Sequence, residues 1–196
     1  VLLVNLLAAT YHEINTILIN LVNLTMNLLK SLLFFIVLLV LSRLIPHPPN
    51  FTPLIAGAVF LPFMLKDRTL IIGLPILCLF ISDLIIGFHS IMLWTYGAFL
   101  IIGLTVFNIS KLNLKTLLGL SLASPTIFYI VSNFGVWLSA ATYTKDLNGL
   151  LECYFLALPF YGNSLVSTVL FSLVFFLTRH LVTKRSESKF IGNSYD

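Results

Sequence analysis

Charged side chains are scarce in this chain of 196 residues, because Asp, Glu, Lys and Arg together make up only 9% of it. An average soluble domain has roughly 25%. Hydrophobic residues account for 59%, and the mean hydropathy is +1.04. Too few polar residues remain to cover the surface of a domain folded in water. The composition therefore excludes a soluble enzyme, a secreted disulfide scaffold and a disordered tail, and it predicts an integral membrane protein embedded in the lipid bilayer.

Catalytic and metal-binding motifs are also missing. The two cysteines, Cys78 and Cys153, lie in different segments and have neither a CxxC nor a zinc-ligand spacing. The chain lacks the His-Glu-x-x-His, Gly-x-Ser-x-Gly and P-loop patterns of common enzymes. We therefore predict no catalytic residues, no metal ligands and no cofactor, and we do not expect an enzyme. The net charge of +4 bears on membrane topology rather than on a nucleic-acid partner.

Long apolar runs are what the chain has in abundance. A membrane-spanning helix needs about 20 mostly apolar residues. Six candidate runs occur, at residues 28–45, 51–65, 70–88, 91–109, 114–134 and 165–182, of which the second is short. They are continuous and lack the alternation of lipid-facing β-strands. The predicted fold class is all-α, a polytopic membrane protein with six transmembrane helices in a domain covering residues 28–183.

The basic residues assign an orientation to these six helices. Nine of the eleven Lys and Arg residues would lie on the side of the N-terminus, and only Arg43 and Lys145 on the other. The nine are Lys30, Lys66, Arg68, Lys111, Lys115, Arg179, Lys184, Arg185 and Lys189. Since short cytoplasmic loops carry the excess of Lys and Arg, both termini are expected in the cytoplasm.

The two ends of the chain are predicted to lie outside the six-helix domain. Residues 1–27 carry a polar stripe at helical spacing, formed by Thr16, Asn20, Asn23 and Asn27 and continued by Lys30. This segment is either an interfacial amphipathic helix or an extension ahead of a natural start at Met26. Residues 184–196 are polar and are expected to form a flexible cytoplasmic tail.

The loops expected on the side of the membrane opposite the cytoplasm are called the outer regions, and two of them contain unusual polar residues. The first outer loop has four prolines in eight residues, from Pro46 to Pro53, and is expected to be stiff and extended, presenting His47 and Asn50. The second region contains Asp83 and His89. An ionisable group inside the membrane boundary needs a partner, and Arg43 lies at a similar depth. We therefore predict an Arg43–Asp83 ion pair, which pins two helices or contributes to a site.

The third outer region is the longest and is rich in aromatic residues. It contains Asn133, Trp137 and Tyr143, and its residues 147–158 are apolar enough for a short helix. Long loops in compact bundles are usually functional. The sequence thus predicts a ligand site formed by His47, Asn50, Asp83, His89, Asn133, Trp137 and Tyr143. The alternatives are a rigid connector for the first loop, an interfacial position for His89 and an aromatic belt for the third region.

Three motifs from these regions resemble an uncharacterised family of bacterial six-helix inner-membrane proteins. They are Arg43-x-x-Pro46-His47-Pro48-Pro49-Asn50-Phe51-x-Pro53, Ser82-Asp83-Leu84-x-x-Gly87-Phe88-His89 and Asn133-Phe134-Gly135-Val136-Trp137. That family in turn looks like the substrate-binding S-components of energy-coupling-factor transporters. The resemblance implies an S-component-like bundle in the bacterial inner membrane. It also implies capture of a vitamin-like nutrient through the first, third and fifth loops.

The resemblance further implies a partner, a transmembrane coupling protein with ATPases. S-components dock through small residues spaced four apart on their first helix. The first apolar run here has none, and Ala56, Gly57 and Ala58 on the second are the nearest candidates for close packing. We expect a substrate-binding transport component. The alternatives are an accessory or structural membrane subunit that interacts through its aromatic outer loop, and, least favoured, an intramembrane lipid enzyme.

Overall fold

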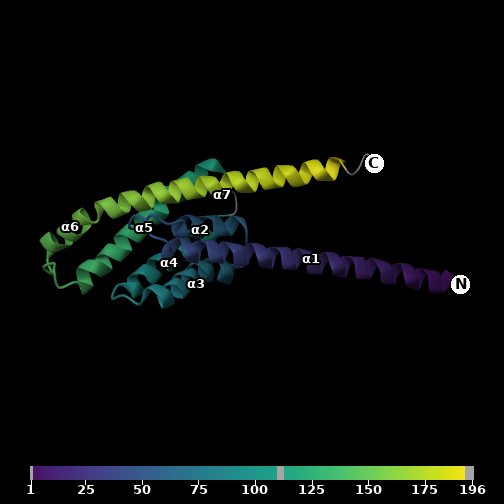
Figure 1. Cartoon of the computed structure of the whole chain (residues 1–196), viewed down its shortest axis with the longest axis horizontal. Coiled ribbons are helices and arrows are strands. Elements are labelled where there is room, and N and C mark those ends of the chain that lie inside the picture. The colour runs from purple at the N-terminus through teal and green to yellow at the C-terminus, as the bar shows by residue number, and fades with distance from the viewer. Residues whose placement is uncertain (1, 110–112, 193–196) are drawn as a thin grey trace. The chain divides into compact units, whose positions relative to one another are not determined.

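The computed structural model of the chain describes residues 2–109 and 113–192, with side chains described for residues 12–23, 25–27, 29–109 and 113–181, and the regular elements in these ranges are helices. No strand occurs in these ranges. The elements are α1 (Leu2–Leu44), α2 (Leu54–Phe60), a 3-10 turn η1 (Leu61–Phe63), α3 (Arg68–Ile86), α4 (Met92–Phe107), α5 (Leu114–Ser139), α6 (Leu147–Leu156) and α7 (Leu158–Gly192), shown in Figure 1.

Four helices are long and apolar enough to cross a membrane. They span His12–Leu44, Arg68–Ile86, Leu114–Ser139 and Leu158–Leu181. The predicted runs at 51–65 and 91–109 form shorter apolar helices, Leu54–Phe63 and Met92–Phe107. The prediction of an all-helical membrane protein is therefore confirmed, with four helices that reach spanning length by themselves.

The chain divides into two compact units, residues 1–38 and 39–196. The first unit is the N-terminal part of α1, in which the polar stripe from Thr16 to Lys30 is exposed. Because α1 is continuous from Leu2 to Leu44, the predicted segment 1–27 and the predicted span 28–45 belong to one helix.

The second unit ends with α7, which continues into the segment predicted as a tail and is helical as far as Gly192. Residues 193–196, Lys111, and the side chains of Lys184, Arg185 and Lys189 lie outside the described residues.

Helix α2 is the centre of the second unit. All seven of its residues are buried, and it packs against α3, α4, α5 and α7. A helix that is hydrophobic on every side belongs in a core, so α2 does not need the length of a lipid-exposed span. Ala56 and Ala58 are 0% and 1% exposed. The candidates for close packing at residues 56–58 therefore pack inside the chain, against the neighbouring helices of the second unit.

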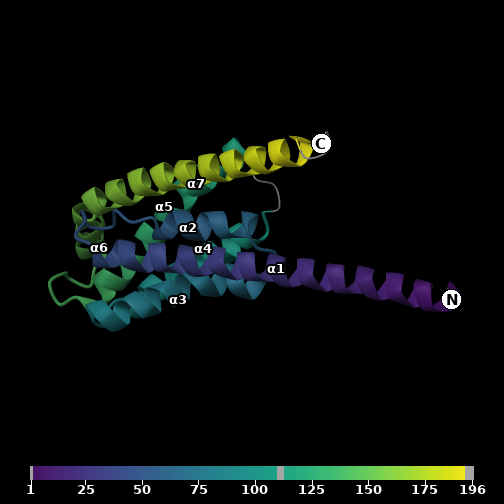
Figure 2. The same cartoon turned by 45° about the vertical axis from the view of Figure 1, so that its right-hand side comes forward.

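Three loops lie at the same end of the second unit and position the site described below. They are residues 45–53 between α1 and α2, 87–91 between α3 and α4, and 140–146 between α5 and α6. We refer to this end as the three-loop end, which is on the left in Figures 1 and 2.

The described basic residues separate between the two ends of the second unit. Arg43 and Lys145 lie at the three-loop end. Arg68, at the start of α3, lies at the opposite end and stacks on the ring of Phe107, with its guanidinium carbon 3.8 Å from the ring centroid. Lys66 precedes Arg68, and Lys115 stands at the start of α5, at this opposite end as well.

Candidate ligand-binding cavity

A cavity of about 670 Å³ opens at the three-loop end. Its walls come from every helix of the second unit and from all three loops. Deep in the cavity the lining is mostly apolar and buried, with Leu54, Ile55, Phe99 and Ala157. At the mouth, the side chains of His47, Asn50 and His89 are exposed. The volume lies within the range of about 300–1,000 Å³ that is typical of small-molecule sites, as is the combination of apolar walls with a few polar groups.

Five of the seven residues predicted for a ligand site line this one cavity. They are His47, Asn50, His89, Asn133 and Tyr143. They come from segments separated by up to 96 positions in the sequence. The other two, Asp83 and Trp137, are not among the lining residues. Their side chains contact other parts of the protein, as described below.

The first loop is held in a tight turn rather than in the extended form expected from its prolines. Phe51 N–H donates to the carbonyl oxygen of Pro48 at 2.9 Å, and Asn50 has a φ of 62°. A type II turn needs a positive φ at its third residue and favours proline at its second, and Pro49-Asn50 meets both requirements. Two α7 side chains secure the turn: Asn163 Nδ2 donates to Pro49 O at 2.9 Å, and Ser167 Oγ to Asn50 O at 3.4 Å.

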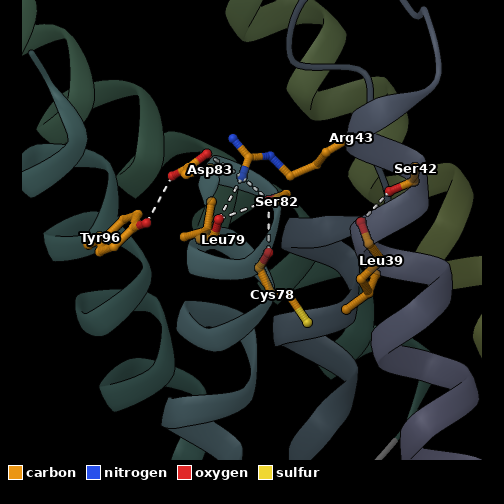
Figure 3. A network of polar contacts seen from close by, with 8 residues as sticks. All are labelled: Leu39, Ser42, Arg43, Cys78, Leu79, Ser82, Asp83 and Tyr96. Atoms are coloured by element: carbon orange, nitrogen blue, oxygen red, sulfur yellow. Dashed lines mark hydrogen bonds and ion pairs between the residues drawn. The ribbon is translucent and has the colours of Figure 1, made fainter. Parts of the chain in front are cut away.

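Arg43 and Asp83 lie at ion-pair distance, with Arg43 Nη1 2.8 Å from Asp83 Oδ1 (Figure 3). The same Nη1 donates to the carbonyl oxygen of Leu79 at 3.2 Å and to Ser82 Oγ. The Asp83 side chain is 0% exposed, whereas the Arg43 side chain is 17% exposed and lines the cavity. The pair joins the end of α1 to α3, and it places the carboxylate behind the arginine rather than in the cavity wall.

Tyr96 completes this network and was not predicted. Its hydroxyl donates to Asp83 Oδ2 at 2.9 Å, so each carboxylate oxygen has its own partner. The sequence contained a signal for this contact. Asp83 lies three residues before the end of α3, and Tyr96 lies four residues after the start of α4. Because a short loop joins these helices, two positions close to that loop lie at a similar depth. Gly87, whose φ of 108° suits glycine, ends α3 there.

The third loop is held by contacts between Trp137 and the residues that follow it. Trp137 Nε1 donates to Thr144 O at 2.9 Å. Lys145 Nζ donates to the carbonyl oxygens of Trp137 and of Ala140, the latter at 2.6 Å. Trp137 thus fixes the loop that carries Tyr143, and it acts on the cavity through that loop. Burial in this loop raises the pKa of the Tyr143 phenol above its ordinary value of 10.0.

Helix α6 covers one side of the cavity and is attached to α5 by two tyrosines, while a third joins α7 to α5. Tyr129 OH donates to Tyr154 O at 2.6 Å, and Tyr154 OH donates to Ile130 O at 2.6 Å. Tyr161 stacks on Tyr129 with ring centroids 4.6 Å apart. Cys153, which lines the cavity, donates from Sγ to Asn133 O at 3.5 Å. These contacts explain why the aromatic residues of this region gather here, and Cys153 is a lining residue that the sequence analysis missed.

Asp146 is the N-cap of α6 and couples that helix to pH. Its Oδ1 accepts from Gly149 N–H at 2.8 Å and from Thr144 Oγ1 at 2.8 Å. The hydrogen bond from the Gly149 amide, followed by that from Thr144, lowers the pKa of this carboxyl from its ordinary value of 3.8. Because the pKa is lower in the folded state, the ionised carboxylate of Asp146 stabilises the folded protein above pH 3.8. This contribution to stability is lost as the pH falls through the folded-state pKa.

We expect acidification below pH 4 to loosen the third loop, seen as a red shift of Trp137 fluorescence in a Trp94→Phe background. The Asp146→Asn variant is the matched control, because an asparagine still caps the helix but does not titrate. Its emission should stay constant over the same range, and Asp146→Ala should show the shifted emission already at neutral pH. Equal pH profiles for the parent and Asp146→Asn would contradict this role.

The chemistry available in the cavity is recognition by hydrogen bonds and apolar contact. Asn133 Nδ2 donates to Tyr129 O at 2.8 Å, which fixes the amide and leaves its oxygen able to accept from a ligand. Buried Ser132 and Thr95 add hydroxyls to the walls. Among the described residues, no group of three or more His, Cys, Asp or Glu side chains could hold a metal ion.

These features define an all-helical membrane protein with a polar-mouthed, apolar-walled cavity at one end. The chain belongs to DUF6580, a family of unknown function, whose sequence profile matches residues 23–190. This match includes residues 39–190 of the second unit and every residue that lines the cavity. No curated protein and no solved structure matches the chain.

Proposed function

We propose that this protein is the substrate-binding component of a transport system and captures a small, vitamin-like nutrient in the cavity at the three-loop end. The observation that supports this most is the convergence of His47, Asn50, His89, Asn133 and Tyr143 on one open cavity. If each loop only connected two helices, nothing would require polar side chains from three loops to converge on one apolar-walled cavity. A small ligand with both polar and apolar parts accounts for the arrangement.

The proposal includes a membrane topology of six crossings with both termini in the cytoplasm. The four long helices cross directly, and α2 and α4 complete the count as short helices within the bundle. This is supported by the burial of every α2 residue, since a helix surrounded by protein does not have to match the bilayer thickness alone. The concentration of Lys66, Arg68 and Lys115 opposite the three-loop end supports a cavity that faces outward.

In this proposal the protein resembles the S-components of energy-coupling-factor transporters in the bacterial inner membrane. A coupling protein with ATPases then supplies the energy for release to the cytoplasm. An accessory membrane subunit would instead be expected to have a filled face at the three-loop end for a protein partner. An intramembrane lipid enzyme needs a reactive group, and the lining residues lack the Ser/His/Asp arrangement of such sites.

The test is native mass spectrometry of the protein purified in mild detergent. We expect a small molecule to remain bound to the parent chain, and we expect His47→Ala and Asn133→Ala each to reduce the bound fraction at least about tenfold, as loss of a hydrogen bond in a desolvated site predicts. The matched controls are His180→Ala and Asn108→Ala, which change exposed residues away from the cavity and should keep the ligand. Retention of the ligand in both cavity variants would refute the site.

A further inference from the structure

The charge of the cavity lining is asymmetric. Among the described residues that line it, Arg43 is the one permanently charged side chain, and no Asp or Glu is present. The nearest carboxylate along the network, Asp83, is 0% exposed and lies behind Arg43. The other polar lining side chains are imidazoles, amides, hydroxyls and a thiol, among them those of His47, His89 and Asn133. The guanidinium of Arg43 is therefore the charged group that the cavity lining offers to an occupant.

The guanidinium of Arg43 is used on one side only. Its contacts with Asp83 Oδ1, Leu79 O and Ser82 Oγ all involve Nη1. Within the described part of the chain, Nη2 and Nε have no such contact. Figure 3 shows the second terminal nitrogen of Arg43 directed away from Ser82. A guanidinium is a rigid fork with five N–H donors, so fixing Nη1 also fixes the direction of the remaining donors.

We propose that the captured molecule is an organic monocarboxylate whose carboxylate binds the free Nη2 and Nε donors of Arg43. This inference rests on the proposed function and assigns its substrate class. The planar guanidinium edge matches the two oxygens of a carboxylate, which accept two parallel hydrogen bonds from it. The imidazoles of His47 and His89 and the amides of Asn50 and Asn133 offer further hydrogen bonds in the same cavity.

The count of charges limits the ligand to no more than one negative charge. Arg43 is already paired with Asp83, and the pair has no net charge. A bound monoanion gives the group of three a net charge of −1, which is shared between the two carboxylates. A phosphate dianion would add a second uncompensated charge at the membrane boundary, which is costly to desolvate. The apolar walls, which include Leu54, Phe99 and Phe128, fit a hydrocarbon or aromatic body behind the carboxylate.

Asp83 and Tyr96 act as positioning residues for this contact. Asp83 holds Nη1 at 2.8 Å, and Tyr96 OH occupies its other oxygen at 2.9 Å. The negative charge of Asp83 is thereby covered on both oxygens and faces the helices rather than the ligand. The arginine keeps its orientation in the empty cavity, which lowers the cost of ordering it when the ligand binds.

The experiment identifies the molecule that co-purifies with the full chain and measures its loss in a charge-neutral variant. Arg43→Gln/Asp83→Asn removes both charges together, so that neither is left buried alone. Gel filtration and thermal unfolding in detergent verify that this variant folds. The matched control is Arg68→Gln, which removes one positive charge at the opposite end of the second unit. Released molecules are analysed by accurate mass before and after methyl esterification, which adds one methyl group per carboxyl.

We expect a released species that gains one methyl group, stays bound in Arg68→Gln, and falls about 10- to 100-fold in Arg43→Gln/Asp83→Asn. A neutral molecule, a phosphate ester or a phospholipid that is lost in Asn133→Ala would overturn the carboxylate assignment and leave the proposed function standing. A carboxylate that stays fully bound in the double variant would overturn the role of Arg43. If the parent chain holds no small molecule, both the proposed function and this inference fall.

Discussion

Arg43→Ala is expected to lower the free energy of unfolding by about 3–5 kcal/mol, because it leaves the carboxylate of Asp83 buried without a positive charge. Asp83 is 0% exposed, so water cannot replace the lost partner in the folded state. Asp83→Ala should be similarly damaging, since Arg43 would lose the group that fixes Nη1. Tyr96→Phe removes one hydrogen bond to the carboxylate and should cost less, about 1–2 kcal/mol.

Thermal and denaturant unfolding in detergent measure these differences, and the charge exchange Arg43→Asp/Asp83→Arg tests the pairing itself. The exchanged pair should recover part of the stability lost in Arg43→Asp, where two carboxylates would face each other. The control is Arg68→Ala, an exposed arginine stacked on Phe107, for which we expect a change below about 1 kcal/mol. If the exchanged protein is no more stable than Arg43→Asp alone, the ion pair is not what holds α1 to α3.

The Arg43–Asp83 contact illustrates what the sequence can predict. Each charge lies near the end of an apolar run at the same predicted depth, and a charge in that position needs a partner. The chain has few charged residues, so Asp83 had few possible partners and Arg43 could be predicted as one. The same scarcity led to His47, Asn50, His89 and Asn133, because in a chain this apolar the remaining polar groups are informative wherever they gather.

Trp137 shows where prediction from composition stops. Its residue type suits an aromatic ligand site, but its Nε1 donates to the backbone carbonyl of Thr144. Every residue offers a backbone carbonyl, so no pattern of side chains indicates which one a tryptophan will choose. The contacts of Asn163 and Ser167 with the carbonyls of Pro49 and Asn50 were equally invisible to the sequence, because they join segments more than 110 positions apart.

The helix lengths differ from the apolar runs for a related reason. Hydropathy marks where a chain is apolar, and a helix continues through polar residues as long as nothing ends it. No proline or glycine stands between the polar stripe of residues 16–30 and Arg43, and α1 runs through without a break. Helix α2 is short because Pro53 precedes it and Pro62 follows it. The two prolines allow its ends to be predicted from the sequence, whereas its central position in the bundle cannot be.

A close contact between α4 and α5 leads to the other large effect we expect, at Gly135 on α5. A Cβ at this position would lie 2.1 Å from Cγ and 2.5 Å from Cβ of Trp94 on α4. Both distances are far below contact, and the atoms belong to the base of the tryptophan side chain. A rotation of the ring cannot relieve the overlap with Trp94 Cβ, so the two helices must separate. Gly135→Ala should therefore destabilise the fold by about 3 kcal/mol, at the upper end for overpacking.

Gly119→Ala is the matched control, because Gly119 lies on the same helix and a Cβ there meets nothing within 4 Å. The two variants add the same methyl group to the same helix, and alanine favours a helix over glycine by up to about 1 kcal/mol. Gly119→Ala should be neutral or slightly stabilising in thermal unfolding. Equal melting temperatures for the two variants would contradict the close approach of α4 and α5.

The separation of α4 from α5 should also reach the cavity, since Thr95 and Phe99 line it from α4 and Ser132, Asn133 and Val136 line it from α5. Asn133 is held by Tyr129 on its own helix and moves with α5. Below its melting temperature, Gly135→Ala should therefore retain less of the co-purifying molecule than Gly119→Ala does. A folded Gly135→Ala protein with full ligand occupancy would show that the distance between these helices does not control the site, and recognition would then depend on the loops alone.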